Sequence, residues 1–379
     1  MWVRELRLDN FRNYERLELH LGKGVNVFVG QNGAGKTNLL EGVYLLATGR
    51  ALRASREAEM LRWGSDWTYL RALVEARSGD LVVEVSLGKA GKSSRVNGCE
   101  SRRIHDLLGN LKVVFFSPDE LNLVKGPPQA RRRYMDILLS QVSKAYYQFA
   151  LLYYRLVNQK NAYLKEVGQG KPDRDLLESL DEALSAAGAR LVIFRGKALE
   201  ELGRLALGYM QRITGGREEL AVVYSPSAPG LQRTGYGEES FELVRDELKK
   251  EIARARNVEL ARRISLIGPH RDDICFILNG KDVRCFGSQG QQRSAVLALK
   301  LAEVDFIREA TGDSPVLLLD DVFSELDNAR KTFLGEVLSG TAQCLLTTAE
   351  LGSGDHLQEG YKDCYVFEIA DGRVVSCNH

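Results

Sequence analysis

The sequence lacks the features of a membrane-spanning protein and of a disulfide-stabilised one. No run of about 18 apolar residues occurs in the chain, so no helix is expected to cross a membrane. The amino-terminal stretch MWVRELRLDNFRNYERLEL has no apolar core behind a basic start, which argues against a signal peptide. Six cysteines are scattered without a CxxC pair, which argues against a zinc site and a disulfide framework. These absences predict a soluble, cytoplasmic protein with reduced thiols.

An excess of charge of one sign is also missing. The 52 basic and 51 acidic residues leave a net charge of +1. If the protein binds nucleic acid, a local basic patch must do so, because the overall charge provides no attraction. The length of 379 residues and the apolar fraction of 44% suit a globular protein of two or three domains with a proper core.

The hydrophobic pattern divides the chain into three segments. Residues 1–123 show short strand patterns and one helix, an α/β arrangement. Residues 124–262 show long helical patterns, each about 40 to 60 Å if continuous, which is too short for a long coiled-coil arm. Strand patterns return in residues 263–379. The sequence therefore predicts an α/β head built from 1–123 and 263–379, with 124–262 inserted as an α-helical lobe.

A glycine-rich segment, GQNGAGKT, follows a predicted strand at Val25–Val29 and precedes a predicted helix. It fits the phosphate-loop pattern in the strand–loop–helix context that this motif needs. Its glycines let backbone N–H groups turn toward an anion, and the helix adds the positive end of its dipole. Lys36 is predicted to reach the β- and γ-phosphates and Thr37 to ligate Mg²⁺; a fortuitous glycine turn is the alternative. The predicted nucleotide-binding residues here are Gly30, Gln31, Asn32, Gly33, Ala34, Gly35, Lys36, Thr37 and Asn38.

Two adjacent acids end the apolar strand pattern VLLLDD. Asp320 is predicted to hold Mg²⁺ through water, together with Thr37. Asp321 is placed to polarise the attacking water as general base. The alternative is an acidic pair at the start of a helix, which is a common structural feature.

A second candidate phosphate-binding surface lies in FGSQGQQR. Ser288, Gly290 and Gln291 start a predicted helix, with Ser288 as its N-cap, and resemble the ABC signature Ser-Gly-Gly-Gln. In ABC-type ATPases that surface serves the γ-phosphate of the opposite subunit, so Ser288 is predicted to act in trans. Asp327 in SELDNAR resembles the D-loop at the dimer seam. The order of these motifs resembles an ABC-type (P-loop NTPase) head interrupted by an arm, as in the SMC class.

Further segments accompany these motifs in order: LRLDNFRNY, GQNGAGKTNLLEGVYLLATGRALR, FSPDELNLVKGPPQARRRYMD, GPHRDD, GSQGQQR and LLLDDVFSELD. Through them the chain resembles the RecF family of bacterial recombination-mediator ATPases over essentially its full length. The resemblance implies ATP and Mg²⁺ as cofactors, an ATP-dependent homodimer, and binding to duplex DNA and to single-strand junctions. It also implies weak, DNA-stimulated ATP hydrolysis and work with RecO and RecR at gapped or stalled-fork DNA.

Two departures from transporter-type ABC patterns bear on turnover. The second acid is Asp321 where a Glu is usual, and Thr347-Thr348 stand where many ABC heads carry a switch histidine. Both favour slow hydrolysis, as in a timing switch. No clear Gln follows the strand pattern KVVFF, so a Q-loop role, if filled, falls to SPDE at residues 117–120.

The predicted DNA contacts belong to the densest basic cluster, and such cations contact phosphates without reading bases. A solvated basic face is the alternative. The cluster consists of Lys125, Arg131, Arg132 and Arg133. Further cations of the helical lobe are Arg190, Arg195, Lys197 and Arg204. Arg50, Arg53 and Arg56 are either a solvated turn or a contact to a phosphate or the dimer seam.

Four other functions are weighed against this one. A metal nuclease using Asp272 and Asp273 of GPHRDD lacks a third acidic motif, so His270 and Arg271 are interpreted as a head–lobe joint. A transporter ATPase subunit would need a membrane partner and no DNA. A chromosome organiser would need a longer coiled coil. A nucleotide-sensing scaffold would release no phosphate.

Overall fold

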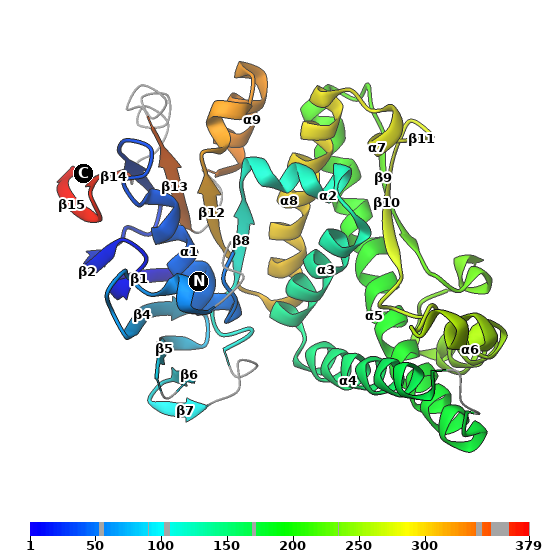
Figure 1. The fold of residues 1–379 in the computed structure, drawn as a ribbon. Coiled ribbons are helices and arrows are strands. Elements are labelled where there is room, and N and C mark those ends of the chain that lie inside the picture. Colours follow the sequence, from blue (N-terminus) through cyan, green and yellow to red (C-terminus); the bar gives the residue numbers. More distant parts are fainter. Residues whose placement is uncertain are drawn as a thin grey trace. The chain divides into compact units, whose positions relative to one another are not determined.

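The structure, a computed structural model, describes residues 1–52, 57–89, 91–101, 107–168, 172–233, 235–338, 343–349 and 364–378. The chain packs as two compact units, Met1–Glu120 with Glu303–His379, and Leu121–Ala302 (Figure 1). Residues 263–302, assigned to the head from the sequence, thus pack with the helical unit, and the functional division into head and lobe stays a prediction. Within the described ranges, every helix is too short or too polar to span a bilayer.

The main sheet of the first unit has the order β15-β14-β3-β13-β12-β8. Five of its strands run parallel, and only β15 is antiparallel to its neighbour. Every residue of β3, β8, β12 and β13 is buried, as expected for parallel strands covered on both faces. The strands are β3 (Val25–Val29), β8 (Val113–Phe116), β12 (Val316–Asp320), β13 (Gln343–Thr348), β14 (Cys364–Ala370) and β15 (Arg373–Asn378).

A second, antiparallel sheet of the same unit has the order β2-β1-β4-β5-β6-β7. Helix α1 (Lys36–Thr48) contacts strands of both sheets and is buried nearly all round. A close approach at Gly42 shows how tight this packing is, since a Cβ there would lie 2.9 Å from the Leu8 side chain. The strands are β1 (Trp2–Phe11), β2 (Tyr14–His20), β4 (Trp67–Ala76), β5 (Gly79–Gly88), β6 (Gly91–Val96) and β7 (Cys99–Ser101). Helix α9 (Asn328–Leu338) follows β12.

The second unit is mainly helical, as its sequence pattern predicts. Its helices are α2 (Asn122–Lys125), α3 (Pro128–Val142), α4 (Lys144–Val167), α5 (Arg174–Thr214), α6 (Phe241–Arg262) and α7 (Val283–Phe286). Helix α8 (Gln289–Thr311) begins in it. A small sheet, β11-β10-β9, consists of β9 (Leu220–Ser225), β10 (Asp273–Leu278) and β11 (Lys281–Asp282).

Two local features add detail to the predicted segments. In ICFILNGKDVRCF a hairpin turns at Asn279-Gly280, and its second strand is only β11, because Asp282 caps a short helix, α7, through the N–H groups of Arg284 and Cys285. Strand β9 lies inside the segment predicted to be helical. Its partner β10 is more than 40 residues away in sequence, so local periodicity gave no sign of the pairing.

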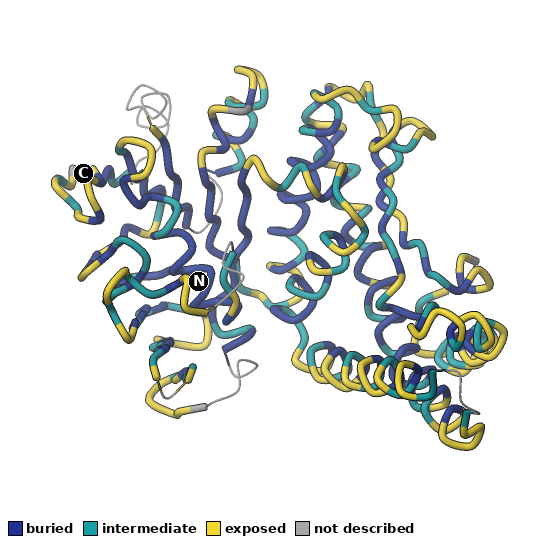
Figure 2. The backbone as a smooth tube through the Cα atoms, viewed as in Figure 1, coloured by how far each residue is buried: buried dark blue, intermediate teal, exposed yellow. Residues whose placement is uncertain are grey.

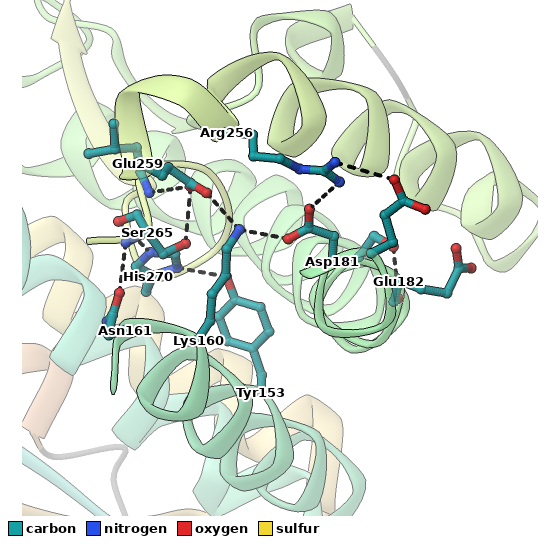
Figure 3. A network of polar contacts seen from close by, with 12 residues as sticks. Tyr153, Lys160, Asn161, Asp181, Glu182, Arg256, Glu259, Ser265 and His270 are labelled. Atoms are coloured by element: carbon teal, nitrogen blue, oxygen red, sulfur yellow. Dashed lines mark hydrogen bonds and ion pairs between the residues drawn. The ribbon is translucent and has the colours of Figure 1, made fainter. Parts of the chain in front are cut away.

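A buried ion cluster links α4, α5 and α6 (Figure 3). Lys160, which is fully buried, lies 2.7 Å from Asp181 Oδ1 and 2.6 Å from Glu259 Oε2. Arg256 also contacts Asp181, and Glu259 accepts the Leu266 N–H. The charges of the buried acids are thus matched by cations and N–H donors, which is the condition for burying them.

Candidate functional site

The carboxyl ends of parallel strands meet at one edge of the main sheet, which is where open α/β sheets bind ligands. Four segments of the first unit line a cavity of about 380 Å³ there. They are residues 32–33 and 35–38 after β3, 118–119 after β8, the pair Asp320-Asp321 at the end of β12, and Thr347 with Ala349 at the end of β13. The loop and the acids thus meet at one cavity, and SPDE contributes two lining residues.

The phosphate loop has the backbone that its glycines predict. Gly33 and Gly35 have φ angles of +86° and +115°, which suit glycine, and a Cβ at Gly33 would meet no atom within 4 Å. Gly35 caps α1, whose first-turn N–H groups have no acceptor within the helix. A Cβ at Gly30 would lie 2.2 Å from the Ile369 carbonyl oxygen, so this glycine is required by packing. The loop therefore presents N–H donors beside open space.

Two residues outside the phosphate-loop motif hold this loop. Asn13 Nδ2 donates to the Ala34 carbonyl at 3.0 Å, and Asn13 Oδ1 accepts from Asn38 Nδ2 at 2.8 Å. The buried Tyr14 hydroxyl donates to the Gly35 carbonyl at 2.9 Å. Asn13 lies in the turn between β1 and β2, and Tyr14 begins β2, so both lie outside the loop in sequence. The motif alone gave no sign of them.

Lys36 folds back over the loop. Its Nζ donates to the carbonyls of Gly30 at 2.6 Å and Gln31 at 2.9 Å, which leaves one ammonium N–H. Burial lowers the pKa of Lys36, while Asp321 and Asp320 act in the opposite direction. Gly30, Gln31 and Ala34 use their carbonyls to shape the loop, and they are not among the cavity-lining residues.

The acidic pair is bound to the loop and to β13. Thr37 Oγ1 donates to Asp320 Oδ1 at 2.7 Å, and Thr347 Oγ1 donates to the same oxygen at 2.8 Å. Asp320 is buried, whereas Asp321 is exposed and has a left-handed φ of 52°. One acid is therefore fixed against the loop and the other faces solvent at the cavity.

The donor set fits a magnesium nucleotide. Carboxylate and hydroxyl oxygens are the ligands that Mg²⁺ prefers, and Thr37 and Asp320 supply both. The N–H groups and Lys36 supply the donors that a polyphosphate needs. The cavity volume lies within the range of small-molecule sites.

The candidate signature belongs to the second unit. Ser288 caps α8 as predicted, since Ser288 Oγ accepts the Gln291 N–H at 3.3 Å and Gln291 Oε1 accepts the Ser288 N–H at 2.8 Å. Ser288 is exposed, and Gln291 also donates to Glu218. Asp327 in the first unit is exposed and caps α9 through the Arg330 N–H.

One residue of the predicted DNA-binding cluster, Arg131, is buried and not exposed. Arg131 is 2% exposed, pairs with both oxygens of Asp273, and donates to the carbonyls of Leu123 and Gly126, so it cannot serve a DNA phosphate. Arg195 is likewise buried against Asp136. Lys125 and Arg133 are exposed, and Arg132 donates to the Asp272 carbonyl. Arg53 and Arg56 lie outside the described residues.

The GPHRDD segment is tied into the second unit. Asp272 accepts from the Tyr224 hydroxyl and the Ser227 N–H, and Asp273 pairs with Arg131. No cluster of three potential metal ligands occurs within the described part of the chain. Both carboxylates are thus engaged by hydrogen bonds or an ion pair within the second unit.

His270 is held as a neutral ring. Its Nε2 lies 3.2 Å from the Ser265 carbonyl, which can only accept, so Nδ1 accepts from the Tyr153 hydroxyl at 2.7 Å. Burial lowers the pKa of His270 to about 4.

Comparison with known proteins identifies relatives over the whole chain. Residues 2–355 match the model of the RecF/RecN/SMC N-terminal domain family. The DNA replication and repair protein RecF of Symbiobacterium thermophilum is 42% identical over 376 residues, covering 99% of this chain and 98% of that protein. The protein of the same name from Bacillus subtilis is 36% identical over 376 residues, covering 99% and 100%.

Solved structures agree with these relatives. A structure of the recombination mediator protein RecF with ATP in the RecFOR pathway is 35% identical, has a TM-score of 0.90, and covers 100% of this chain and 98% of that one. An Smc head domain with an extended coiled coil, at 15% identity and a TM-score of 0.57, shares the fold alone. The fold is thus an ABC-type ATPase head with an inserted helical segment.

Proposed function

Since the chain belongs to the RecF family, we propose that it is an ATP-dependent DNA-binding protein of recombinational repair. The observation that carries this proposal is that the phosphate loop, with Thr37, and Asp320 lie around one cavity and are joined by a hydrogen bond. ATP is the proposed ligand, because the loop offers N–H donors and a lysine to a polyphosphate. When bound, Mg²⁺ neutralises charge that develops on the phosphates.

Two copies complete each site in this proposal. The cavity-lining residues all come from the first unit and do not include Ser288. Ser288, Gly290 and Gln291 present a helix N-terminus that can receive a γ-phosphate from a second copy. Asp327, exposed before α9, lies at the seam. ATP therefore joins the two heads, and hydrolysis with Asp321 as general base releases them.

The closed dimer binds duplex DNA near a single-strand junction, and DNA stimulates its weak ATPase. The support is family membership together with exposed cations such as Lys125 and Arg133. Because a solved relative is described as part of the RecFOR pathway, we extend RecO and RecR to this chain as proposed partners. The outcome of their joint work is loading of a recombinase at gapped or stalled-fork DNA.

Light scattering with ATP, with ADP, and with ATP plus gapped DNA tests the dimer. We expect a dimer with ATP, a monomer with ADP, and a DNA-bound dimer in the third mixture. A protein that stays monomeric while saturated with a non-hydrolysable ATP analogue and gapped DNA contradicts the proposal.

Phosphate release with and without gapped DNA tests the chemistry. Stimulation by DNA supports repair work over a transporter subunit. Binding of ATP with no phosphate release would instead favour a nucleotide-sensing scaffold.

A further inference from the structure

Thr347 lies between the two halves of the nucleotide site. It is near the end of β13, which pairs on one side with β3, before the phosphate loop, and on the other with β12, before the acidic pair. In this register Thr347 stands opposite Asp320 and Phe28. Its exposed fraction is 1%, and it lines the cavity.

The Thr347 hydroxyl bridges the two acids. Its oxygen donates to Asp320 Oδ1 at 2.8 Å and accepts the Asp321 N–H at 3.0 Å. A hydroxyl can do both at once, whereas a methyl group of the same size can do neither. Asp321 N–H also lies 3.3 Å from the Thr347 carbonyl, a longer contact.

The backbone at Asp321 has an uncommon conformation. Its φ of 52° lies in the left-handed region, which residues with a side chain adopt infrequently, Asp and Asn more often than most. This φ helps to set the direction in which the Asp321 side chain leaves the backbone. A hydrogen bond to the Asp321 N–H therefore helps to fix where its carboxylate points.

We propose that Thr347 is a positioning residue, whose hydroxyl aligns Asp320 and Asp321 with the phosphate loop for hydrolysis. The inference rests on the proposed function, because it presumes that Asp321 acts on the attacking water. Thr347 touches the acids and does not itself exchange a proton with the substrate.

Replacement of Thr347 by Val and by Ser tests this role. We expect Thr347→Val to lower kcat by about tenfold or more while leaving the affinity for ATP without Mg²⁺ within about twofold, since the loop and Lys36 are unchanged. The ATP-bound dimer should live correspondingly longer in light scattering. Thr347→Ser retains the hydroxyl and should restore most of kcat.

Thr68→Val is the matched control. Thr68 is also buried in the first unit, and its Oγ1 donates to the Asp9 carbonyl at 2.9 Å, away from the cavity. Both valine variants should lose similar stability against urea, but only Thr347→Val should slow hydrolysis. Normal kcat in Thr347→Val, or equal slowing in Thr68→Val, overturns the inference. A wild-type protein without any phosphate release would instead overturn the proposed function.

A separate observation concerns the exposed side of α4. Residues 137–165 contain no Asp or Glu, and the exposed cations of α4 are Lys144, Arg155 and Lys165. Exposed residues follow one side of the helix along its length (Figure 2). The three cations span about 31 Å. They have no ion-pair partner among the described residues.

Helix α6 shows the usual arrangement for comparison. Three of its exposed cations, Lys249, Lys250 and Arg254, contact Glu182, Glu247 and Glu251, respectively. The fourth cation of α4, Lys160, is buried in the ion cluster of Figure 3 and does not contribute to the exposed side. The outer side of α4 therefore carries three uncompensated charges with amide side chains between them, such as Gln148 and Asn158.

We infer that this α4 surface, defined by Lys144, Arg155 and Lys165, binds the phosphate backbone of duplex DNA. The inference rests on the proposed DNA binding and names one surface that performs it. Unpaired cations match a polyanion, and amides add hydrogen-bond donors for phosphate oxygens without reading bases. The first acidic residue of α4 is Glu166, so no carboxylate of α4 before it would repel a DNA phosphate.

Replacement of the three α4 cations by Gln tests the surface, with Lys249, Lys250 and Arg254→Gln as a control of equal charge change. For duplex DNA with ATP, we expect the α4 variant to bind at least about tenfold more weakly. Its slope of log affinity against log salt should fall in magnitude by up to about 2.7, or 0.9 for each lost phosphate contact. ATP-driven dimerisation should persist.

An unchanged salt slope in the α4 variant overturns the assignment. This is also the result expected if the α4 surface binds an acidic protein and not DNA. An equal loss in the α6 control shows an effect of net charge alone and also overturns it. Failure of the wild-type protein to bind DNA counts against the proposed function.

Discussion

Thr37 Oγ1 donates to Asp320 Oδ1 at 2.7 Å, although 283 residues separate them in the chain. The sheet order explains the contact, because only β13 lies between the strands that precede the loop and the acids. A magnesium ion bound by these oxygens would therefore depend on both ends of the chain folding together.

Lys36→Met should weaken ATP binding by about 100-fold and with it dimerisation and tight DNA binding. A hydrogen bond to a charged group contributes about 1.5–3 kcal/mol, and the lysine supplies charge as well. Titration with a fluorescent ATP analogue measures the loss. Lys23→Met, an exposed lysine of the same unit, is the control and should bind normally.

Asp321→Asn should trap the ATP dimer. The amide cannot accept a proton from water, and loss of a general base commonly slows a reaction 10²- to 10⁴-fold. Single-turnover phosphate release and the dimer lifetime measure this together. A variant that turns over normally contradicts the role given to Asp321.

Ser288→Arg should leave ATP binding intact and keep the protein monomeric with ATP. The larger cation would occupy the space offered to a neighbouring γ-phosphate, while the cavity in the first unit stays unchanged. Light scattering and nucleotide titration on one sample separate the two properties. Ser179→Arg, on an exposed position of α5, should still dimerise.

The free energy of unfolding should fall as the pH is lowered, because the unfolded chain binds a proton at His270 more readily than the folded protein does. The pKa of His270 is lowered from 6.5 to about 4 in the folded protein, so between these values the unfolded chain binds the extra proton. The free energy of unfolding should therefore drop from about pH 6.5 downward and level off below about pH 4, by up to about 3 kcal/mol. Urea unfolding from pH 7 to 4 measures this slope. His270→Asn should reduce it, and an unchanged slope would assign it to other groups.

Lys160→Met should destabilise the protein by about 3 kcal/mol, because it leaves Asp181 and Glu259 buried with less compensation. Replacing Lys160, Asp181 and Glu259 together by apolar residues should cost less than the single change. Urea unfolding measures the free energy of unfolding of the wild type, of Lys160→Met and of the triple variant. Lys165→Met, on the exposed side of α4, is the control.

Short-range sequence patterns predicted the parts of the candidate site that consist of a few consecutive residues. The glycines at 33 and 35 have the positive φ angles expected of a phosphate loop, and Ser288 caps its helix. The acids end a buried strand as their apolar run indicates. Each of these depends on a few consecutive residues, so the sequence carries the signal by itself.

The sequence by itself determined that an ABC-type head would form, because a phosphate loop, a segment that resembles the ABC signature and an acidic strand end occur in order. Only the tertiary structure decided which other residues serve these motifs. Strand register places Thr347 beside Asp320, and a turn places Asn13 beside the phosphate loop. Arg131 is buried in an ion pair with Asp273 and is not part of the exposed basic surface. Burial and pairing depend on neighbours that are distant in sequence. A run of cations in one segment therefore does not show which of them face solvent.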